Sequence, residues 1–257
     1  MIRFNNISKS FNNKKILDDI SGEFYSGKIN MIIGASGTGK SVLLKSIVGI
    51  HNIDEGNIYF DDIRCDHLNR NDSIVLQVKK NIRMLFQNSA LILSKTIEEN
   101  VRLPLDLLTN LSLSEKQEKV DYVLDQVNLI DAKKKYPNEI SGGMQKRAGI
   151  ARAIVNNPKY LFCDEPNSGL DPQTSFVIDQ LIQKITGLYN TTTVVVSHNL
   201  DSVITISDNI IFLYKSKKIW EGNKESIMNT DNEYLLNFLK SSKSMSILLN
   251  EKNNINI

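Results

Sequence analysis

Residues 34–41 form a Gly-rich segment with the residue types and spacing of a phosphate-binding loop. The segment matches the pattern G-x-x-x-x-G-K-S/T. Its members are Gly34, Ala35, Ser36, Gly37, Thr38, Gly39, Lys40 and Ser41. Glycines let backbone N–H groups approach phosphate oxygens, and the positive end of a following helix attracts the same anion. In such loops the lysine, here Lys40, contacts the β- and γ-phosphates, and the hydroxyl of Ser41 binds Mg²⁺. The segment therefore predicts binding of ATP together with Mg²⁺.

Two adjacent carboxylates, Asp164 and Glu165, follow the apolar run Tyr160–Cys163. In nucleotide-hydrolysing proteins with a phosphate loop, an aspartate at the end of such a strand holds Mg²⁺. The next acid can then polarise the water that attacks the γ-phosphate. The alternative is a pair of solvated carboxylates that begins a loop, since adjacent acids at strand ends are common. A phosphate loop in the same chain favours the catalytic interpretation, and we expect Cys163 to be a core residue of the strand.

The composition is that of an ordinary globular protein and argues against several functional classes. Of the 257 residues, 41% are hydrophobic and 23% are charged, and the formal net charge is +2. A charge this close to neutral does not favour binding to nucleic acid or to an anionic membrane surface. Cys65 and Cys163 form no CxxC pair, so we expect neither a disulfide scaffold nor a zinc site. The same observation predicts a reducing, cytosolic compartment. We see no secretory signal and no apolar run near the ~20 residues that cross a bilayer, so work at a membrane would need another subunit.

Short apolar runs alternate with helical stretches along the chain, which predicts an α/β fold. The expected strands are Ile29–Ile33, Ile58–Phe60, Met84–Phe86, Tyr160–Cys163 and Thr192–Val196, with a terminal hairpin of Ile210–Tyr214 and Lys218–Trp220. One helix follows the phosphate loop and stops near Gly49, and another covers Pro172–Ile185. Residues from about 93 to 156 are charged and helical in period, which predicts an inserted helical lobe. The polar end of the chain, residues 241–257, predicts a loosely held tail.

The run Ser141-Gly142-Gly143-Met144-Gln145 lies between the phosphate loop and the carboxylate pair and opens a helical stretch. As local structure it is a helix N-cap in a Gly-rich turn. It also resembles the LSGGQ signature of the ABC ATPases. In that family the bare N–H groups of this helix contact the γ-phosphate of the nucleotide held by the opposite subunit. The resemblance therefore implies that Ser141, Gly142 and Gly143 bind ATP and that the active form is a head-to-tail homodimer.

Further positions of the family follow in order along the chain. Phe11 resembles the aromatic residue that stacks on adenine, where Tyr is commoner. Gln87 resembles the Q-loop glutamine, which contacts Mg²⁺ and water and couples to the helical lobe. Ser168-Gly169-Leu170-Asp171 resembles the D-loop, with Gly169 where Ala is more usual. His198, after a β-branched run, resembles the switch histidine that contacts the γ-phosphate.

The resemblance covers residues 1–240 and implies one ABC-type P-loop ATPase domain. It implies an N-terminal antiparallel β part and a helical subdomain, residues 93–156, that docks on a transmembrane partner. Glu165, His198 and Gln87 would be catalytic, and Ser41, Gln87 and Asp164 would hold the metal. The two remaining histidines, His51 and His67, are expected at the surface.

Several positions are similar to one branch of the family, the ATPases of the MCE-linked (Mla) phospholipid transport system. Met144 replaces the usual Gln of the signature, and Val42 stands where many relatives have Thr. The segments Leu85–Leu91 and Glu99–Leu105 also fit this branch. The resemblance implies an MlaE-like permease, an MCE-domain protein beyond the membrane and a small STAS-domain regulator. It places the ATPase in the cytoplasm, peripheral on the inner face of the inner membrane. The tail after Lys240 either contacts the neighbouring subunit, as in that branch, or is disordered.

Other classes remain to be separated from this interpretation. The ATPase of another ABC importer, or of a cell-division-type ABC signalling complex, would carry almost the same motifs. A soluble ABC ATPase of DNA repair would be expected to carry long coiled coils, zinc sites or a doubled cassette, and the sequence has none of these features. We therefore expect no nucleic acid partner.

Overall fold

A six-stranded sheet forms the centre of the protein. The computed structural model describes residues 1–65 and 72–241. The strands of this sheet are β3 (Ile29–Ile33), β6 (Ile82–Leu85), β7 (Tyr160–Asp164), β8 (Thr192–Val196), β9 (Asn209–Tyr214) and β10 (Lys217–Gly222). Their order is β10-β9-β3-β8-β7-β6, parallel except for β10. The residues of β3, β7 and β8 are all buried, as expected for parallel strands covered on both faces.

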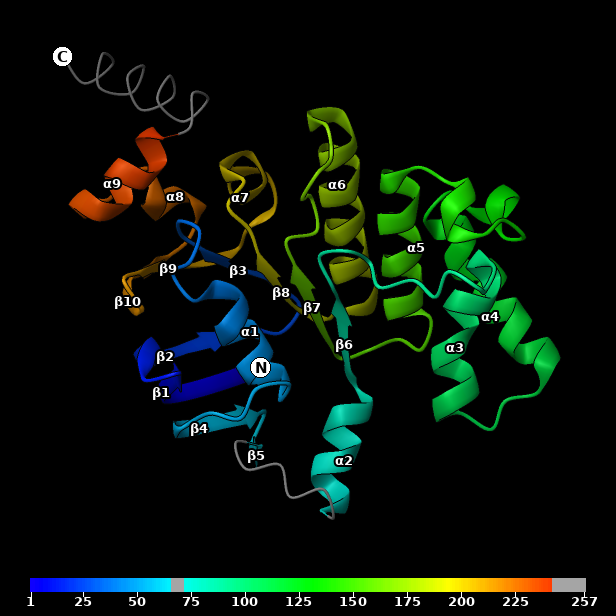
Figure 1. Ribbon diagram of the computed structural model, residues 1–257, viewed down its shortest axis with the longest axis horizontal. Helices are drawn as coiled ribbons and strands as arrows, with labels where there is room; N and C mark the ends of the chain where they lie inside the picture. Colours follow the sequence, from blue (N-terminus) through cyan, green and yellow to red (C-terminus); the bar gives the residue numbers. More distant parts are fainter. Residues whose placement is uncertain (66–71, 242–257) are drawn as a thin grey trace.

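A second, antiparallel sheet lies at the N-terminal side of the molecule (Figure 1). Its strands are β1 (Ile2–Phe11), β2 (Lys14–Phe24), β4 (Glu55–Phe60) and β5 (Ile63–Arg64), in the order β2-β1-β4-β5. Asn12 and Asn13 join β1 to β2 with φ angles of +47° and +61°. Two residues with positive φ between paired strands make the tight turn that matches strand twist, and Asn tolerates this conformation well. The expected N-terminal antiparallel part is therefore present.

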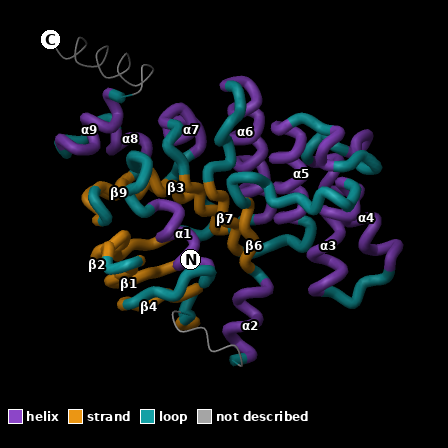
Figure 2. Tube along the Cα trace, in the orientation of Figure 1, coloured by secondary structure: helices purple, strands orange, loops and turns teal. Residues whose placement is uncertain are grey.

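Helices cover the six-stranded sheet and extend beyond it. They are α1 (Lys40–Val48), α2 (Ser73–Lys80), α3 (Ile97–Leu108), α4 (Leu113–Gln126), α5 (Gly142–Ile154), α6 (Pro172–Tyr189), α7 (Leu200–Ile206), α8 (Lys224–Ile227) and α9 (Glu233–Lys240). Two short 3₁₀ turns, Ile130–Ala132 and Pro137–Glu139, separate α4 from α5. Figure 2 shows α3 and α4 at the end of the molecule opposite the antiparallel sheet. None of the helices in the described part of the chain is long and apolar enough to cross a membrane.

Two hydrophobic cores lie on the two faces of the six-stranded sheet. On β3, Met31 and Ile33 belong to the core shared with α5, α6 and α7, whereas Ile32 belongs to the core shared with α1 and the antiparallel sheet. This alternation follows from the two-residue period of a strand. Helix α1 is therefore held between the two sheets, directly after the phosphate loop (Figure 1). Cys163 is fully buried on β7, as expected, and burial raises the pKa of its thiol to about 12.

The observed elements agree with most of the expected ones. Strand β6 ends one residue early, at Leu85, and the helix after the D-loop continues to Tyr189, where Asn190 in left-handed conformation ends it. The short elements α2, β5, α7, α8 and α9 were not expected. The helical stretch from residue 93 comprises α3, α4 and α5, but α5 also packs on β6 and α6, so its separation as an inserted subdomain stays a prediction. The tail from residue 242 and His67 lie outside the described residues.

Candidate functional site

The phosphate loop runs from the end of β3 to the start of α1. Gly39 is the N-cap of α1, has a φ of +101° and has no side chain that could accept a capping hydrogen bond, so the first N–H groups of the helix remain available. A Cβ atom on Gly39 would lie 2.7 Å from the carbonyl oxygen of Ile16. Both the positive φ and the close approach of β2 therefore require glycine here. The result is a helix N-terminus that can bind an anion.

Lys40 is the first residue of α1, and its side chain extends back to the start of the phosphate loop. Its Nζ donates hydrogen bonds to the carbonyl oxygens of Gly34, at 2.8 Å, and Ala35, at 2.9 Å. Burial lowers the pKa of the Lys40 ammonium, and the nearby charges of Glu165 and Asp164 oppose this effect. The side chain is thus held beneath the loop, where an ammonium can turn towards phosphate oxygens.

Asp164 ends β7 and lies against the first turn of α1. The Oγ of Ser41 donates to Oδ1 of Asp164 at 2.6 Å, and Nζ of Lys45 lies 3.5 Å from Oδ2. Hard cations such as Mg²⁺ take oxygen ligands, and they are usually bound by one or two protein groups together with substrate phosphates. The hydroxyl and carboxylate of this pair fit such an ion. Among the described residues, no group of three or more His, Cys, Asp or Glu side chains could hold a metal by itself.

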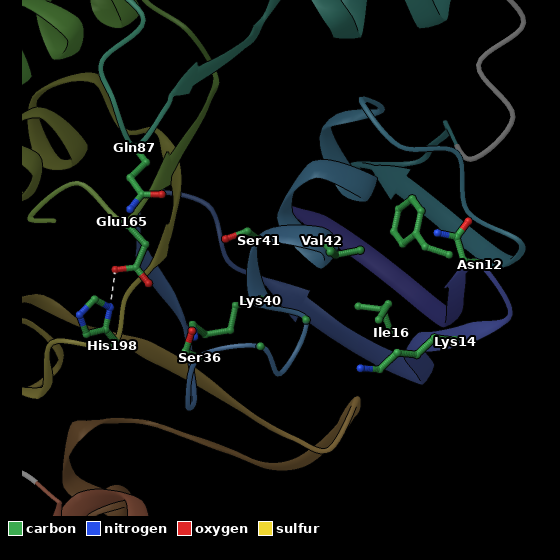
Figure 3. Close-up of a pocket in the computed structure, with 13 residues that line it drawn as sticks. Asn12, Lys14, Ile16, Ser36, Lys40, Ser41, Val42, Gln87, Glu165 and His198 are labelled. Atoms are coloured by element: carbon green, nitrogen blue, oxygen red, sulfur yellow. Dashed lines mark ion pairs between the residues drawn. The ribbon is translucent and has the colours of Figure 1, made fainter.

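Glu165 and His198 form a pair at the carboxyl ends of β7 and β8. Nδ1 of His198 lies 2.7 Å from Oε2 of Glu165 (Figure 3). Glu165 has a φ of +51°, and its backbone N–H donates to the carbonyl of Val196 at 3.0 Å. A left-handed conformation is unfavourable for glutamate, and strain of this kind is concentrated at functional sites. The sheet therefore fixes both the backbone and the carboxylate of Glu165.

Gln87, just beyond β6, lines a cavity that also contains Lys40, Glu165 and His198. Its Nε2 donates to the Oγ of Ser168 at 3.0 Å, so its side chain lies against the D-loop segment. Its backbone carbonyl accepts a hydrogen bond from Nζ of Lys146 on α5. Gln87 is thus held at both its side chain and its main chain.

Phe11 lies at the other end of the cavity, at the Asn12–Asn13 turn. Its ring is 40% exposed, with Nζ of Lys9 5.3 Å from the ring centroid. The ring of His51 meets it nearly edge-on, with centroids 5.4 Å apart. His51, which was expected at the surface, is partly exposed and packs against Phe11.

The cavity has a volume of about 1010 Å³ and brings most of the predicted site together. Nine predicted residues line it, namely Phe11, Ser36, Gly37, Gly39, Lys40, Ser41, Gln87, Glu165 and His198. Gly34, Ala35, Thr38 and Asp164 lie outside the lining, and Asp164 is reached through Ser41. Sequence reasoning missed Asn12, Lys14, Ile16 and Val42, which also line it. The consecutive asparagines after Phe11 were a turn signal that could have placed the first two at the rim.

The signature segment lies in a different cavity, of about 490 Å³. Ser141 caps α5, accepting a hydrogen bond from the N–H of Met144 at 3.3 Å. A Cβ atom on Gly143 would lie 2.6 Å from Cγ2 of Thr174 on α6, so glycine allows the two helices to approach here. Ser141, Gly142 and Gly143 line this cavity with residues of the D-loop segment, and none of its lining residues belongs to the first cavity. Within one chain, the signature segment and the phosphate loop are therefore separate sites.

Comparisons with known proteins agree with this geometry. The family model described as "ABC transporter" matches residues 17–168. A protein of Mycobacterium bovis named "Probable ribonucleotide transport ATP-binding protein mkl" is 34% identical over 98% of this chain and 69% of its own length. The "Methionine import ATP-binding protein MetN" of Campylobacter jejuni is 36% identical over 94% of this chain and 76% of its own length.

A solved structure of an ATP-binding cassette is similar to this chain in both fold and sequence. The dimeric structure of the ATP-binding cassette MJ0796 in a post-hydrolysis state, bound to ADP and Pi, superposes with a TM-score of 0.78. It is 30% identical and covers 87% of this chain and 99% of that one. A match of the family model to more than half of the chain, relatives above 30% identity and this fold all agree. The chain therefore belongs to the ATP-binding subunits of the ABC transporter family, which are ATP-hydrolysing P-loop enzymes.

Proposed function

We propose that this chain hydrolyses MgATP as a head-to-tail dimer and drives phospholipid transport through an MCE-linked permease. The observation that carries the hydrolytic part is the pairing of Glu165 with His198 in the cavity that also contains Lys40. A carboxylate fixed by a hydrogen bond in a phosphate-binding cavity can orient an attacking water.

In this proposal the phosphate loop and Lys40 bind the triphosphate, and Phe11 stacks on the adenine. Ser41 and Asp164 would hold Mg²⁺, with the amide oxygen of Gln87 at the same ion. Magnesium, when bound, would neutralise part of the negative charge of the phosphates. The hydroxyl–carboxylate contact of 2.6 Å already places the two protein oxygens side by side.

Glu165 would accept a proton from water as that water attacks the γ-phosphate in line. His198 would keep the carboxylate oriented and contact the γ-phosphate. Gln87 would fix the position of the same water. Glu165 and His198 follow neighbouring strand ends of the rigid sheet, whereas Gln87 lies on the loop just beyond β6.

A second copy is required to complete the site. The cavity at Ser141–Gly143 contains the N-terminus of α5, which Ser141 caps, but none of the residues of the phosphate loop. Two copies arranged head to tail would bring this N-terminus to the γ-phosphate held by the other copy. The dimeric state named for the solved cassette structures supports this arrangement.

The membrane partner is expected at the helical region. Leu107 at the end of α3 and Leu113 at the start of α4 are each 73% exposed, and a permease would cover such apolar surface. The resemblance at Met144 and Val42 favours the phospholipid branch, with an MlaE-like permease, an MCE-domain protein and a STAS-domain protein. The ATPase would then act at the cytoplasmic face of the inner membrane.

A different transported solute is the main rival, because the relatives described above are named for ribonucleotide transport and methionine import. The motifs of the hydrolytic site are shared by all these proteins and do not separate them. A cell-division-type signalling complex is a further rival.

Affinity purification of the tagged full chain from detergent-solubilised membranes, followed by mass spectrometry, separates these proposals. Recovery of a permease with an MCE-domain protein supports lipid transport. Recovery of a permease with a solute-binding protein, or of a division protein, rejects it. The double variant Leu107→Glu/Leu113→Glu should lose the permease. The control Leu188→Glu, at a leucine of α6 that is 52% exposed, should retain it.

A further inference from the structure

Lys146 is a buried lysine in the second turn of α5. It is 6% exposed, and its Nζ donates to the backbone carbonyl of Gln87. None of the ion pairs among residues 1–65 and 72–241 involves Lys146. A buried ammonium without a carboxylate partner is unfavourable unless polar groups compensate it. Here the Gln87 carbonyl accepts a hydrogen bond from the ammonium. Burial lowers the pKa of Lys146, and the nearby charge of Glu165 opposes this effect. The side chain and the loop that carries Gln87 therefore depend on each other.

Two further contacts join α5 to the same loop. The guanidinium of Arg152 donates to the carbonyl oxygens of Ala90, at 2.7 Å, and Ser89. Gly149 lies between the two basic residues, and a Cβ atom on it would be 3.2 Å from Cβ of Ser89. Lys146, Gly149 and Arg152 are spaced by three residues and therefore lie on one face of the helix. This face, which we call the loop-facing side of α5, is attached to the segment 87–90 along its length.

The conformation of segment 87–90 makes this attachment specific. Ser89 and Ala90 have φ angles of +58° and +47°, which are unusual for residues other than glycine. Ser89 is 2% exposed. The segment therefore keeps its shape through contacts with neighbouring elements, and the hydrogen bonds from α5 are among them.

The contacts between α5 and segment 87–90 join two groups that contact nucleotide in the proposed dimer. The N-terminus of α5 is Ser141–Gly143, about 6 Å along the helix from Lys146 at ~1.5 Å per residue. The other end is Gln87, whose side chain bonds Ser168 and lines the cavity of the phosphate loop. A short stretch of helix is rigid, so a displacement of its N-terminus is passed to the loop.

We propose that Lys146 is a positioning residue that couples the two nucleotide sites of the dimer. When the N-terminus of α5 engages the nucleotide of the partner copy, Lys146 sets the position of Gln87 at the nucleotide of its own copy. The inference rests on the dimeric ATPase proposed above. It assigns to Lys146 a role in coupling rather than in binding or stability.

The test compares Lys146→Met, Lys146→Arg and the control Lys184→Met in the full chain. Methionine keeps the length of the side chain and removes the donor, and arginine restores a donor. Lys184 is exposed on α6 and controls for loss of one positive charge. The measurements are kcat, KM and the Hill coefficient of ATP hydrolysis, the Kd of a fluorescent ATP analogue, and Tm. ATP-dependent dimerisation is measured in the Glu165→Gln background.

For Lys146→Met we expect kcat to fall at least ten-fold and the Hill coefficient to approach one, with Kd and dimerisation within about two-fold of the parent. Lys146→Arg should recover most of kcat, and Lys184→Met should equal the wild type. A wild-type kcat and Hill coefficient in Lys146→Met overturn the proposal. A parallel loss of Tm, Kd and kcat also overturns it, since that pattern indicates a structural role alone.

Arg152→Met provides a second route if Lys146→Met does not fold. It should lower kcat without changing Kd, and no change in kcat would count against coupling through the loop-facing side of α5. Failure of the proposed function gives a different pattern. In that case the wild-type chain does not hydrolyse ATP, or Glu165→Gln does not dimerise with ATP.

Discussion

Nδ1 of His198 lies 2.7 Å from Oε2 of Glu165, although 64% of the histidine side chain is exposed and only 14% of the glutamate side chain is. The two residues come from the ends of neighbouring parallel strands, β7 and β8. The exposed imidazole thus holds a mostly buried carboxylate in one orientation. Under the proposed function, this contact would give His198 a positioning role towards Glu165.

Replacing His198 by Ala should lower kcat by about 10²-fold, because a misoriented Glu165 no longer aligns water. The Kd for ATP should stay within about three-fold of the wild type, since the phosphate loop and Phe11 are unchanged. Steady-state hydrolysis and equilibrium binding of a fluorescent ATP analogue measure the two quantities. His198→Gln, which keeps a donor, should retain more activity. Equal losses in kcat and in affinity would instead place His198 in binding.

Replacing Phe11 by Ala should raise KM for ATP and leave kcat nearly unchanged. Stacking of a base on an aromatic ring contributes about 1–3 kcal/mol, which corresponds to about 5- to 150-fold in KM. Phe11→Tyr is the matched control and should behave as the wild type. Because His51 packs edge-on against Phe11, His51→Ala should raise KM in the same direction by a smaller factor. An unchanged KM in Phe11→Ala would remove the residue from the nucleotide site.

Ser141→Arg should abolish ATP-dependent dimerisation in the Glu165→Gln background without weakening ATP binding by the isolated chain. The reason is that Ser141 and the phosphate loop lie in separate cavities of one chain. Analytical ultracentrifugation and equilibrium binding report the two effects. Gln183→Arg adds the same charge at an exposed position of α6 and should change neither. Weaker binding by the monomeric Ser141→Arg chain would show that Ser141 acts on the nucleotide of its own copy.

Asp179→Asn should stabilise the chain at neutral pH. Asp179 is 4% exposed, and burial raises its pKa, although hydrogen bonds with Ser202 and Asn167 act in the opposite direction. The folded chain therefore keeps this proton to higher pH than the unfolded chain does. Its contribution to the free energy of unfolding consequently falls as the pH rises from the unfolded pKa through the raised folded one.

Urea unfolding between pH 4 and pH 8 measures this effect. The advantage of Asp179→Asn over the wild type should be present at pH 7–8 and narrow towards pH 4. Asp125→Asn removes a carboxylate at an exposed position of α4 and serves as the control. A difference that is constant across this range would mean that hydrogen bonding alone, and not burial of charge, governs the site.

Much of the site could be predicted from the sequence because its parts are contiguous motifs with local geometry. The phosphate loop is one such motif, and the strand before it and the helix after it were recognisable from their periods. The contact of His51 with Phe11 could not be predicted in this way, since it joins the end of β1 to the loop after α1. The burial of Lys146 could not be predicted either, because a lysine in a helix is usually exposed. Its partner is a backbone carbonyl 59 residues earlier in the chain.

The fold shows the same division between local and long-range features. Strands such as β8 were predicted from a β-branched run, and they are buried on both faces. The short elements α2 and β5 carry weak patterns and depend on tertiary contacts, so they were missed. The left-handed conformation of Glu165 also depends on its surroundings, since it is imposed by the hydrogen bond to β8 and the turn that follows.

In the proposed mechanism, Glu165 activates water in a site where the phosphate loop binds ATP. The most direct measurement compares Glu165→Gln with Lys40→Ala for ATP retention, dimerisation and hydrolysis. We predict that Glu165→Gln loses about 10²- to 10⁴-fold in kcat yet retains ATP in a stable dimer, whereas Lys40→Ala loses nucleotide binding itself. Hydrolysis by Glu165→Gln at the wild-type rate, or normal ATP binding by Lys40→Ala, would contradict this mechanism.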